Sequence, residues 1–347
     1  MKIIKIFPII VFIYIIPFHF PLSSLNAAIP DNERSALIDL YNTCNGDNWV
    51  NNSGWLGVPG SECNWFGVYC NPEMTNIERL DLRGSNWSNK FGIEGEIPKS
   101  IKDLLYVNKI NFEHNNITKI PPEIGYLVHL TSLNLYYNNS LQTLPSEIGN
   151  LTNLTYLHLG DNKITNVPSE IGYLTKLKNL NLSNNEILNI PKEIGNLKEL
   201  QTLYLLSNKL TSLPKEIGNL VNLARLYLNS NDILNLPSEI GNLNKLTYLS
   251  LSSNKLSNIP PEIGKLTNLS ELYMSTLNLE HIPSELFNLS NLTYLSLDSN
   301  NLGNIPSEIG SLSQLTDLTL SANDLSSIPT ELFDLIILII LICHITT

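Results

Sequence analysis

The sequence contains few of the residues that nucleic-acid binding and metal chemistry require. It has 21 lysine and arginine residues against 32 aspartate and glutamate residues, a net charge of −11, and the basic residues are scattered singly. Because phosphate neutralisation requires clustered basic side chains, we expect no nucleic-acid partner. The six histidines are dispersed, and no cysteine and histidine pair has the spacing of a zinc site. We therefore expect neither a metal nor a cofactor.

Catalytic motifs are also missing. The chain has no glycine-rich phosphate loop, no kinase-type catalytic loop, no GxSxG elbow and no HExxH pair, so we expect that it is not an enzyme. A kinase domain would have to lie beyond Thr347. Glutamates recur in Pro-x-Glu segments from Glu123 to Glu331, which leaves paired-carboxylate catalysis as an alternative. Helix N-termini, where the helix dipole favours negative charge, explain them more simply.

No apolar run reaches the ~20 residues that a membrane-spanning helix needs. Residues 1–28 instead predict a secretory signal peptide: basic MKIIK, apolar IFPIIVFIYIIPF, then the small-residue segment SSLNAA. An uncleaved signal anchor is the alternative, although Pro8, Pro17 and Pro21 make a poor spanning helix. Cleavage would start the mature chain near Ile29, in an oxidising compartment, and predicts a secreted or cell-surface protein.

The sequence does contain an extensive repeat. From Val107 onward, segments such as LTNLTYLHLGDNKITNVPSEIGY follow one another at a step of 23 residues. The step is 24 residues once, between Leu130 and Leu154, because Asn139-Ser140 carries one extra residue. A fixed period in this range indicates a solenoid, in which neighbouring units bury a continuous core.

Each position of the repeat predicts a local structure. The LxL core alternates with a period of two, which predicts a short strand with its leucines inward and the intervening residues outward. The asparagine that follows predicts a buried amide that satisfies backbone groups in the turn. Leu277 interrupts this asparagine column, so we expect a local irregularity there. In IPxEIGxL, proline ends the extended segment, Ser or Lys with Glu opens a short helix, and glycine ends it.

The repeat LxxLxLxxNxLxxIPxEIGxL resembles a leucine-rich repeat, and the likeness covers nearly everything after Ile77. Parallel strands stack at ~4.8 Å, whereas helical turns need roughly twice that width, so the stack must curve. We expect an α/β solenoid over residues 77–334, a curved horseshoe with a parallel β-sheet on the concave face and short helices or turns on the convex face. The later units look like the 23-residue repeats of Ras-group intracellular proteins.

The last segment, residues 335–347, opens with the apolar run LIILIILIC. One repeat step beyond Leu315 lies Leu338, and Leu338, Leu341 and Cys343 fall on the LxxLxL positions of an eleventh unit. We interpret the segment as a truncated final repeat. An apolar tail that associates with a membrane, or a lipid-anchor signal, stays open.

Residues 29–76 differ in character and predict an N-terminal capping domain, because the first strand of a solenoid would otherwise expose its apolar side. The segment ERSALIDLYNTC predicts an amphipathic helix with one buried face. That face would contain Ala36, Leu37, Leu40 and Tyr41.

The cap also contains three of the four cysteines. Cys63 and Cys70 are close enough for a short-loop disulfide, which would contribute about 2–3 kcal/mol. Cys343 lies ~45 Å away along the stack, too far to pair with Cys44. We expect Cys44 to be a buried free thiol, and a rearranged pairing of Cys44 within the cap stays open.

The cap resembles that of plant-type extracellular leucine-rich-repeat proteins, which include receptor-kinase ectodomains and polygalacturonase-inhibitor proteins. The likeness rests on the order of helix, GDNWVNNSGWL, CNWFGVYC and IERLDLRGS, and on the ending IEGEIP of the first repeat. This resemblance implies an extracellular protein with a cysteine pair at Cys63 and Cys70. Cys44 is not part of the cysteine pattern of that family.

Ten Asn-x-Ser/Thr sequons fit secretion, although the richness in Asn, Ser and Thr would also produce some by chance. Asn138 is expected in the buried asparagine column and is a poor acceptor. Asn181 is expected in the middle of a concave strand, where a glycan would obstruct binding. The candidate glycosylation sites are Asn51, Asn86, Asn116, Asn150, Asn153, Asn268, Asn288 and Asn291.

The outward strand positions contain the candidate ligand-binding residues. From Tyr204 to Tyr294 each of five consecutive units has one tyrosine, which predicts a stripe about 20 Å long. Tyrosine offers rigid contact area and a hydroxyl, as interface anchors do, although repeat duplication alone would also copy it. The candidates are Tyr156, His158, Tyr204, Arg225, Tyr227, Tyr248, Tyr273 and Tyr294.

These observations favour a non-catalytic extracellular recognition module that binds a protein or peptide ligand through its concave face. The resemblance also admits an inhibitor of a secreted polysaccharide-degrading enzyme. An intracellular signalling scaffold is the alternative that the Ras-group-like units suggest, and an enzyme, or the sensing half of one, is the third. Membrane association would require an uncleaved N-terminus or the C-terminal apolar tail.

Overall fold

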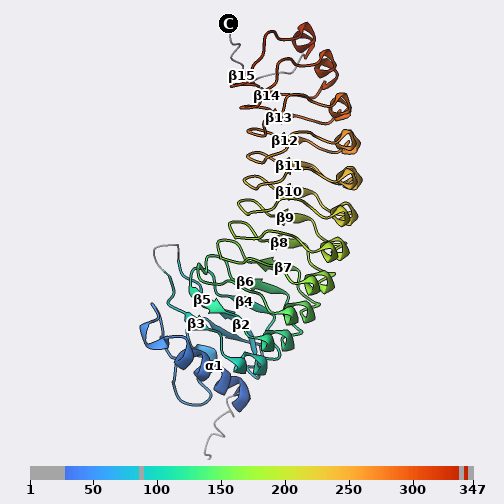
Figure 1. Ribbon diagram of the computed structural model, residues 1–347. Coiled ribbons are helices and arrows are strands. Elements are labelled where there is room, and N and C mark those ends of the chain that lie inside the picture. The colour runs from blue at the N-terminus through green and yellow to red at the C-terminus, as the bar shows by residue number, and fades with distance from the viewer. Residues whose placement is uncertain (1–27, 86–89, 336–339, 343–347) are drawn as a thin grey trace, which may run out of the picture.

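The computed structural model describes residues 28–85, 90–335 and 340–342. Residues 1–27 of the expected signal peptide, the sequon Asn86, and Leu338 and Cys343 of the tail lie outside the described residues. In the described part, an N-terminal helix packs at one end of an array of repeats. Short strands form one side of this array, and short 3₁₀ helices form the opposite side (Figure 1).

The cap is built around helix α1 (Asp31–Thr43). The helix begins directly after Pro30, and Asp31 and Glu33 lie in its first turn, where the helix dipole favours negative charge. It buries the face that the sequence predicts, Ala36, Leu37, Leu40 and Tyr41. Two 3₁₀ helices and the first strand complete the cap: η1 (Gly46–Asn48), η2 (Glu62–Asn64) and β1 (Val68–Cys70).

Aromatic rings fill the centre of the cap. The ring centroids of Tyr41 and Trp49 lie 5.2 Å apart, those of Trp49 and Trp55 4.8 Å apart, and those of Trp55 and Trp65 5.1 Å apart. The ring centroid of Phe91, in the first repeat, lies 5.3 Å from that of Trp49. The cap and the first repeat therefore share one core.

A buried carboxylate joins the cap to the first strand of the repeats. Glu33 is 1% exposed, and it accepts hydrogen bonds from the Ile77 amide and the Asn76 side chain, both at 2.7 Å. Burial is the largest influence on Glu33, and it raises the pKa of this carboxyl above its ordinary value.

The cysteines follow the expected pattern. Cys63 and Cys70 form a disulfide, and Cys44 is a buried free thiol whose Sγ lies 3.4 Å from the Glu96 carbonyl oxygen. Burial raises the pKa of the Cys44 thiol to about 12. Because only the thiolate is a good nucleophile, Cys44 is unreactive in the folded chain.

Thirteen strands form one sheet in the order β1-β2-β4-β6-β7-β8-β9-β10-β11-β12-β13-β14-β15. β1 pairs with its neighbour in antiparallel fashion and the later pairs are parallel. In the parallel pairs the central apolar residue of each strand lies opposite that of the next unit, for example Leu203 opposite Leu226. In β15, Leu341 lies opposite Leu318, in the register that a 23-residue step requires. The strands after β1 are β2 (Ile77–Asp81), β4 (Lys109–Asn111), β6 (Ser132–Asn134), β7 (Tyr156–His158), β8 (Asn179–Asn181), β9 (Thr202–Tyr204), β10 (Arg225–Tyr227), β11 (Tyr248–Ser250), β12 (Glu271–Tyr273), β13 (Tyr294–Ser296), β14 (Asp317–Thr319) and β15 (Ile340–Ile342).

A second sheet, which the sequence analysis did not predict, joins β3 (Glu94–Glu96) to β5 (Asn116–Lys119) in parallel. It is confined to the first repeats, where IEGEIP differs from the later units.

The 3₁₀ helices form the outer side of the curved array and the strands form its inner side, which confirms the predicted solenoid (Figure 1). They are η3 (Lys99–Asp103), η4 (Pro122–Tyr126), η5 (Ser146–Asn150), η6 (Ser169–Tyr173), η7 (Lys192–Asn196), η8 (Lys215–Asn219), η9 (Ser238–Asn242), η10 (Pro261–Lys265), η11 (Ser284–Asn288), η12 (Ser307–Ser311) and η13 (Thr330–Asp334).

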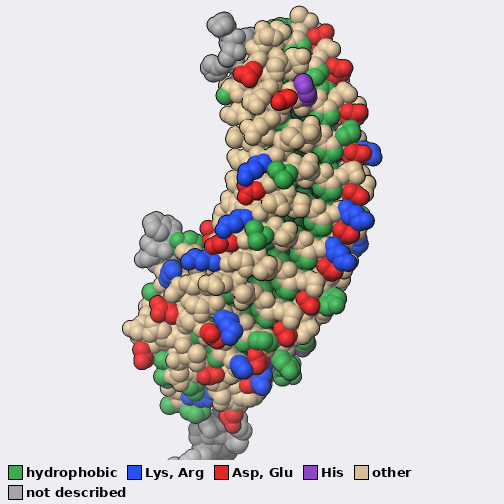
Figure 2. All heavy atoms as spheres, viewed as in Figure 1, with side chains coloured by type: hydrophobic (Ala, Val, Ile, Leu, Met, Phe, Trp, Pro, Cys, Tyr) green, Lys and Arg blue, Asp and Glu red, His purple; other side chains and the backbone are tan. Residues whose placement is uncertain are grey.

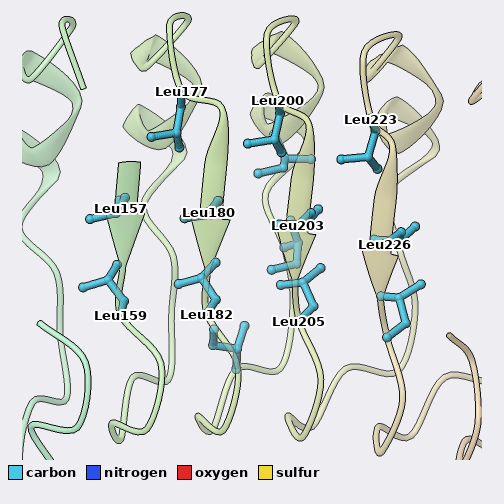
Figure 3. Packing of buried hydrophobic residues seen from close by; sticks show 14 of the residues in the cluster. Leu157, Leu159, Leu177, Leu180, Leu182, Leu200, Leu203, Leu205, Leu223 and Leu226 are labelled. Carbon is cyan, nitrogen blue, oxygen red and sulfur yellow. The ribbon is translucent and has the colours of Figure 1, made fainter. Parts of the chain in front are cut away.

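Leucines from successive repeats stack in columns behind the strands. Figure 3 shows Leu180, Leu203 and Leu226 in one such column, and each is fully buried. Burying a leucine side chain stabilises the folded state by about 2 kcal/mol, so like units hold one another together.

The predicted asparagine column is a ladder of buried amides that is interrupted at Leu277. The Nδ2 of Asn208 donates to the Leu182 carbonyl of the preceding repeat at 2.9 Å and to the Leu205 carbonyl of its own repeat at 3.1 Å. Its Oδ1 accepts from the Ile187 amide at 3.1 Å. Asn138, rather than Asn139, holds this position in the 24-residue unit.

The irregularity expected at Leu277 is present. Asn278 has a φ of 64°, in addition to the positive φ of 58° at Thr276 that the neighbouring units share at the equivalent position. Asn300 of the next repeat accepts hydrogen bonds from the amides of both Leu277 and Leu279.

The predicted role of the repeat glycine is wrong. In η8 the glycine, Gly218, lies within the 3₁₀ helix rather than after it, and its backbone is not left-handed. A Cβ on Gly218 would lie 2.3 Å from the carbonyl oxygen of Glu239 in the next repeat. The glycine is therefore required by the close approach of neighbouring repeats on the outer side.

Candidate functional site

The inner face of the sheet presents the residues that flank each buried leucine. In β10 Leu226 is fully buried, Arg225 is exposed, and Tyr227 is partly exposed. Among the predicted tyrosines, Tyr156 is 37% exposed, and those from Tyr204 to Tyr294 are partly exposed. Strand alternation therefore places these side chains outside the core.

Five of these tyrosines form an unbroken ladder. The centroid distances between successive rings are 4.5, 4.5, 5.1 and 4.7 Å. The first pair of rings is stacked and the other three pairs are tilted at 31° to 37°, so the rings contact one another along the whole row. We call this row the tyrosine ladder; its members are Tyr204, Tyr227, Tyr248, Tyr273 and Tyr294.

The hydroxyls of three members of the tyrosine ladder, Tyr227, Tyr248 and Tyr273, are neutral near pH 7. Burial raises the pKa of Tyr227, Tyr248 and Tyr273, and the carboxylate of Glu271 raises each further. The Tyr273 hydroxyl donates to Glu271 Oε2 at 2.9 Å. Because a neutral phenol both donates and accepts, the ladder can form hydrogen bonds with either kind of group on a ligand.

Tyr156 and His158 belong to a separate aromatic cluster. His158 stacks on Tyr136 with centroids 4.6 Å apart, and its Nδ1 lies 3.1 Å from the Tyr156 hydroxyl. Burial lowers the pKa of His158 to about 4, so the ring is neutral near pH 7. His114 and Tyr137 complete the cluster.

The predicted residues thus divide into two groups. Asn179 and Asn181 of β8 lie opposite the β7 residues Tyr156 and His158 and separate them from Tyr204 in β9. Strand alternation did not predict Tyr136, Tyr137 and His114, because these three residues follow the strands instead of flanking their central leucine or isoleucine.

Two shallow recesses lie on the same face near the cap. One, of about 420 Å³, is lined by residues that include Tyr69, Arg79 and Lys109. The other, of about 230 Å³, is lined by Arg79, Lys109 and Tyr156 among others. The Arg79 guanidinium lies 3.7 Å from the Tyr69 ring centroid. None of Tyr69, Arg79 and Lys109 was among the predicted site residues.

The repeated glutamates are on the opposite face. Each lies in the first turn of a 3₁₀ helix, for example Glu216 in η8 and Glu239 in η9, so each repeat supplies one carboxylate to the outer side. Within the described ranges, no group of three or more His, Cys, Asp or Glu side chains could hold a metal ion.

The candidate glycosylation sites differ in exposure. Asn138 is fully buried, and Asn181 lies in β8 on the inner face. Asn51, Asn116 and Asn153 are partly buried. The exposed candidates are Asn150, Asn268, Asn288 and Asn291. The part of the chain that the structure describes contains no helix of the length and apolarity needed to span a bilayer.

Two family models match the chain. The model described as a leucine-rich repeat region matches residues 79–184 and 168–281, and the model described as a leucine rich repeat matches residues 267–325. The matches cover more than half of the chain.

The curated relatives are plant receptor-like kinases. A putative leucine-rich repeat receptor-like serine/threonine-protein kinase of Arabidopsis thaliana is 38% identical over 121 residues, which is 32% of this chain and 12% of the relative. The probable receptor-like kinase IRK of the same plant is 32% identical over 68 residues, which is 20% of this chain and 6% of the relative. The chain therefore matches only a small part of each relative's length.

Solved structures extend the likeness. The Arabidopsis receptor kinase HAESA, solved with the peptide hormone IDA and the co-receptor SERK1, has a TM-score of 0.72 and 25% identity, covering 88% of this chain and 52% of that chain. The ectodomain of Arabidopsis thaliana GASSHO1/SCHENGEN3, solved with CASPARIAN STRIP INTEGRITY FACTOR 2, has a TM-score of 0.69 and 26% identity, covering 90% and 44%. A leucine-rich repeat protein of Leptospira interrogans has a TM-score of 0.58 and 35% identity, covering 76% of each chain.

Proposed function

Because the chain belongs to the leucine-rich repeat family, we propose that it is a non-catalytic extracellular recognition module that binds a protein or peptide ligand on its concave sheet. The tyrosine ladder is the single observation that carries this proposal. Five partly exposed rings in contact, with centroid spacings of 4.5 to 5.1 Å, provide a rigid aromatic surface that also offers hydroxyl groups. Such side chains lose little conformational entropy on binding, which is why tyrosine is enriched among interface anchors.

The likeness to receptor ectodomains supports a peptide as the ligand class. HAESA was solved with a peptide hormone, and 88% of the present chain has the same fold as HAESA. The inner face offers a long surface rather than one deep pocket, which suits an extended ligand that contacts several repeats.

An extracellular location is part of the same proposal. The signal-like segment 1–28, the cap of residues 29–76 with its Cys63–Cys70 disulfide, and the likeness to receptor-like kinases support it. Repeats over 77–334 would present the ligand-binding face, with 335–347 as a truncated repeat or apolar tail. N-terminal sequencing of the expressed protein tests this location: a secreted chain that begins near Ile29 supports it, whereas an intact N-terminus in the cytosol favours the intracellular scaffold.

Ligand binding is tested with a random 12-residue peptide library selected on the full chain. We expect peptides from this selection to bind Tyr227→Ala/Tyr248→Ala at least tenfold more weakly than wild type, measured by calorimetry. The control is Tyr126→Ala/Tyr173→Ala, which removes two outer-face tyrosines that are each 61% exposed. Affinity that falls only in the control variant, or equally in both, would contradict binding on the concave sheet.

A further inference from the structure

The charge of the chain is strongly uneven. Beyond Lys265 the sequence contains no lysine or arginine and nine aspartate and glutamate residues. Most of the net charge of −11 therefore belongs to the last repeats. In the view of Figure 2, the upper end of the molecule shows acidic side chains and no basic ones.

Part of this negative charge lies on the tyrosine ladder. Glu271, Tyr294 and Asp317 occupy the same outward position in β12, β13 and β14, so two carboxylates flank one ring. Asp298 follows β13 and is partly buried. Among the described residues, none of these three carboxylates forms an ion pair with a lysine or arginine, unlike Asp232, which pairs with Lys255 at 2.8 Å.

Hydroxyl groups orient these carboxylates without neutralising them. Glu271 accepts from the Tyr273 hydroxyl at 2.9 Å, and Asp317 accepts from Thr316 at 2.7 Å. Asp298 accepts from the Ser296 hydroxyl at 3.1 Å and from a backbone amide at 2.9 Å. The negative charge therefore stays fixed on the face and uncompensated, and it favours a cationic partner.

The ladder also has an open end. The Tyr294 ring contacts Tyr273 on one side at 4.7 Å, and no other ring of the described chain contacts it. On the β14 side its in-register neighbour is Asp317. An aromatic face next to a carboxylate is a favourable environment for a guanidinium or ammonium group, which gains from both.

We propose that the Glu271–Asp317 end of the tyrosine ladder binds a basic segment of the ligand, with a lysine or arginine side chain stacked on Tyr294 and paired with Asp317 or Glu271. This inference rests on the proposed function, because it assumes that the concave sheet is the ligand-binding face. Arg225, the one basic residue at the outward positions of the described strands β8 to β14, lies two strands from Glu271, so the ligand has its positive charge toward the β14 end.

The test uses a rhodamine-labelled 12-residue peptide of alternating arginine and serine, and a counterpart in which citrulline, the neutral isostere, replaces arginine. Fluorescence anisotropy with the full chain should show at least tenfold tighter binding of the arginine peptide. Glu271→Gln/Asp317→Asn should weaken arginine-peptide binding about tenfold. Tyr294→Ala should weaken it about fivefold, and Tyr294→Phe should retain it because the ring face remains.

The matched control is Glu285→Gln/Glu308→Gln, which removes the same charge from η11 and η12 on the outer face, where both carboxylates are exposed. It should change affinity less than twofold, and all variants should keep the wild-type circular dichroism spectrum. If both double variants lost the same affinity for the arginine peptide, net charge alone would explain the binding, and the inference would be overturned. So would equal binding of the arginine and citrulline peptides.

The library-selected peptides separate this inference from the proposed function. If they are weakened by Tyr227→Ala/Tyr248→Ala but not by Glu271→Gln/Asp317→Asn, the inference fails and the proposed function stands. If neither variant weakens them, the proposed function itself fails.

Discussion

Replacing Asn208 by alanine removes one rung of the buried amide ladder. The wild-type side chain donates to the Leu182 and Leu205 carbonyls at 2.9 and 3.1 Å and accepts from the Ile187 amide at 3.1 Å. Alanine would leave the Ile187 amide without a partner, whereas the Leu182 and Leu205 carbonyls would keep the hydrogen bonds that they accept from Asn185 and Asn231. At about 1 to 2 kcal/mol for the unsatisfied amide and about 0.5 to 1 kcal/mol for each of the two lost carbonyl bonds, the free energy of unfolding should fall by about 2 to 4 kcal/mol.

The assay is urea denaturation followed by circular dichroism. Because neighbouring repeats are coupled only through their interfaces, the slope against urea must be checked for separate unfolding of one end. Hydrogen exchange should show faster exchange in the repeats on both sides of Asn208, since its bonds span two units.

The matched control is Asn219→Ala in η8, where the asparagine is exposed and its side chain makes no hydrogen bond to the described residues. It should change stability by no more than about 0.5 kcal/mol. If Asn208→Ala also costs less than about 1 kcal/mol, the ladder is not a major source of stability and the reasoning is refuted.

Three further predictions concern the cap and the outer side. Gly218→Ala should lower the free energy of unfolding by about 2 to 3 kcal/mol, because the added Cβ would meet the backbone of the next repeat. The control is Gly303→Ala, whose Cβ would meet nothing within 4 Å and which should be near neutral in the same urea titration. Cys63→Ala/Cys70→Ala should cost about 2 to 3 kcal/mol, and reductant should then cause no further loss. Burial holds the pKa of Glu33 above its ordinary value, so the folded chain binds the Glu33 proton more tightly than the unfolded chain does. The free energy of unfolding of the wild type, relative to that of Glu33→Gln, should therefore fall as the pH rises from about 4 to about 7. A relative free energy that rises over this range would contradict the prediction.

The repeat register could be predicted from the sequence because it depends on local patterns that recur many times. The LxL core has only one arrangement that buries both leucines, so the pattern alone is enough to place Leu203 and Leu226 in neighbouring strands. The same holds for the asparagine column and for the irregularity at Leu277, since a buried turn needs an amide and leucine has none.

The role of the glycine could not be predicted in this way. A glycine after a helix-like segment indicates a helix C-terminus when one repeat is considered alone. At Gly218 the actual constraint is the carbonyl of Glu239, a contact between repeats that depends on how closely the outer 3₁₀ helices pack.

The candidate face was predicted in outline and not in detail. Alternation placed Tyr204 to Tyr294 outward, but the division between this row and the cluster of His158 and Tyr136 depends on ring orientations and on the polar residues of β8. The second sheet, β3 and β5, was missed because its short strands lack a two-residue alternation.

The central claim is that ligand lies across the tyrosine ladder. A crystal structure of the full chain with one library-selected peptide tests it most directly. The account predicts peptide atoms in van der Waals contact with both Tyr227 and Tyr248; a peptide bound along the 3₁₀ helices of the outer side, with the ladder unoccupied, would contradict it.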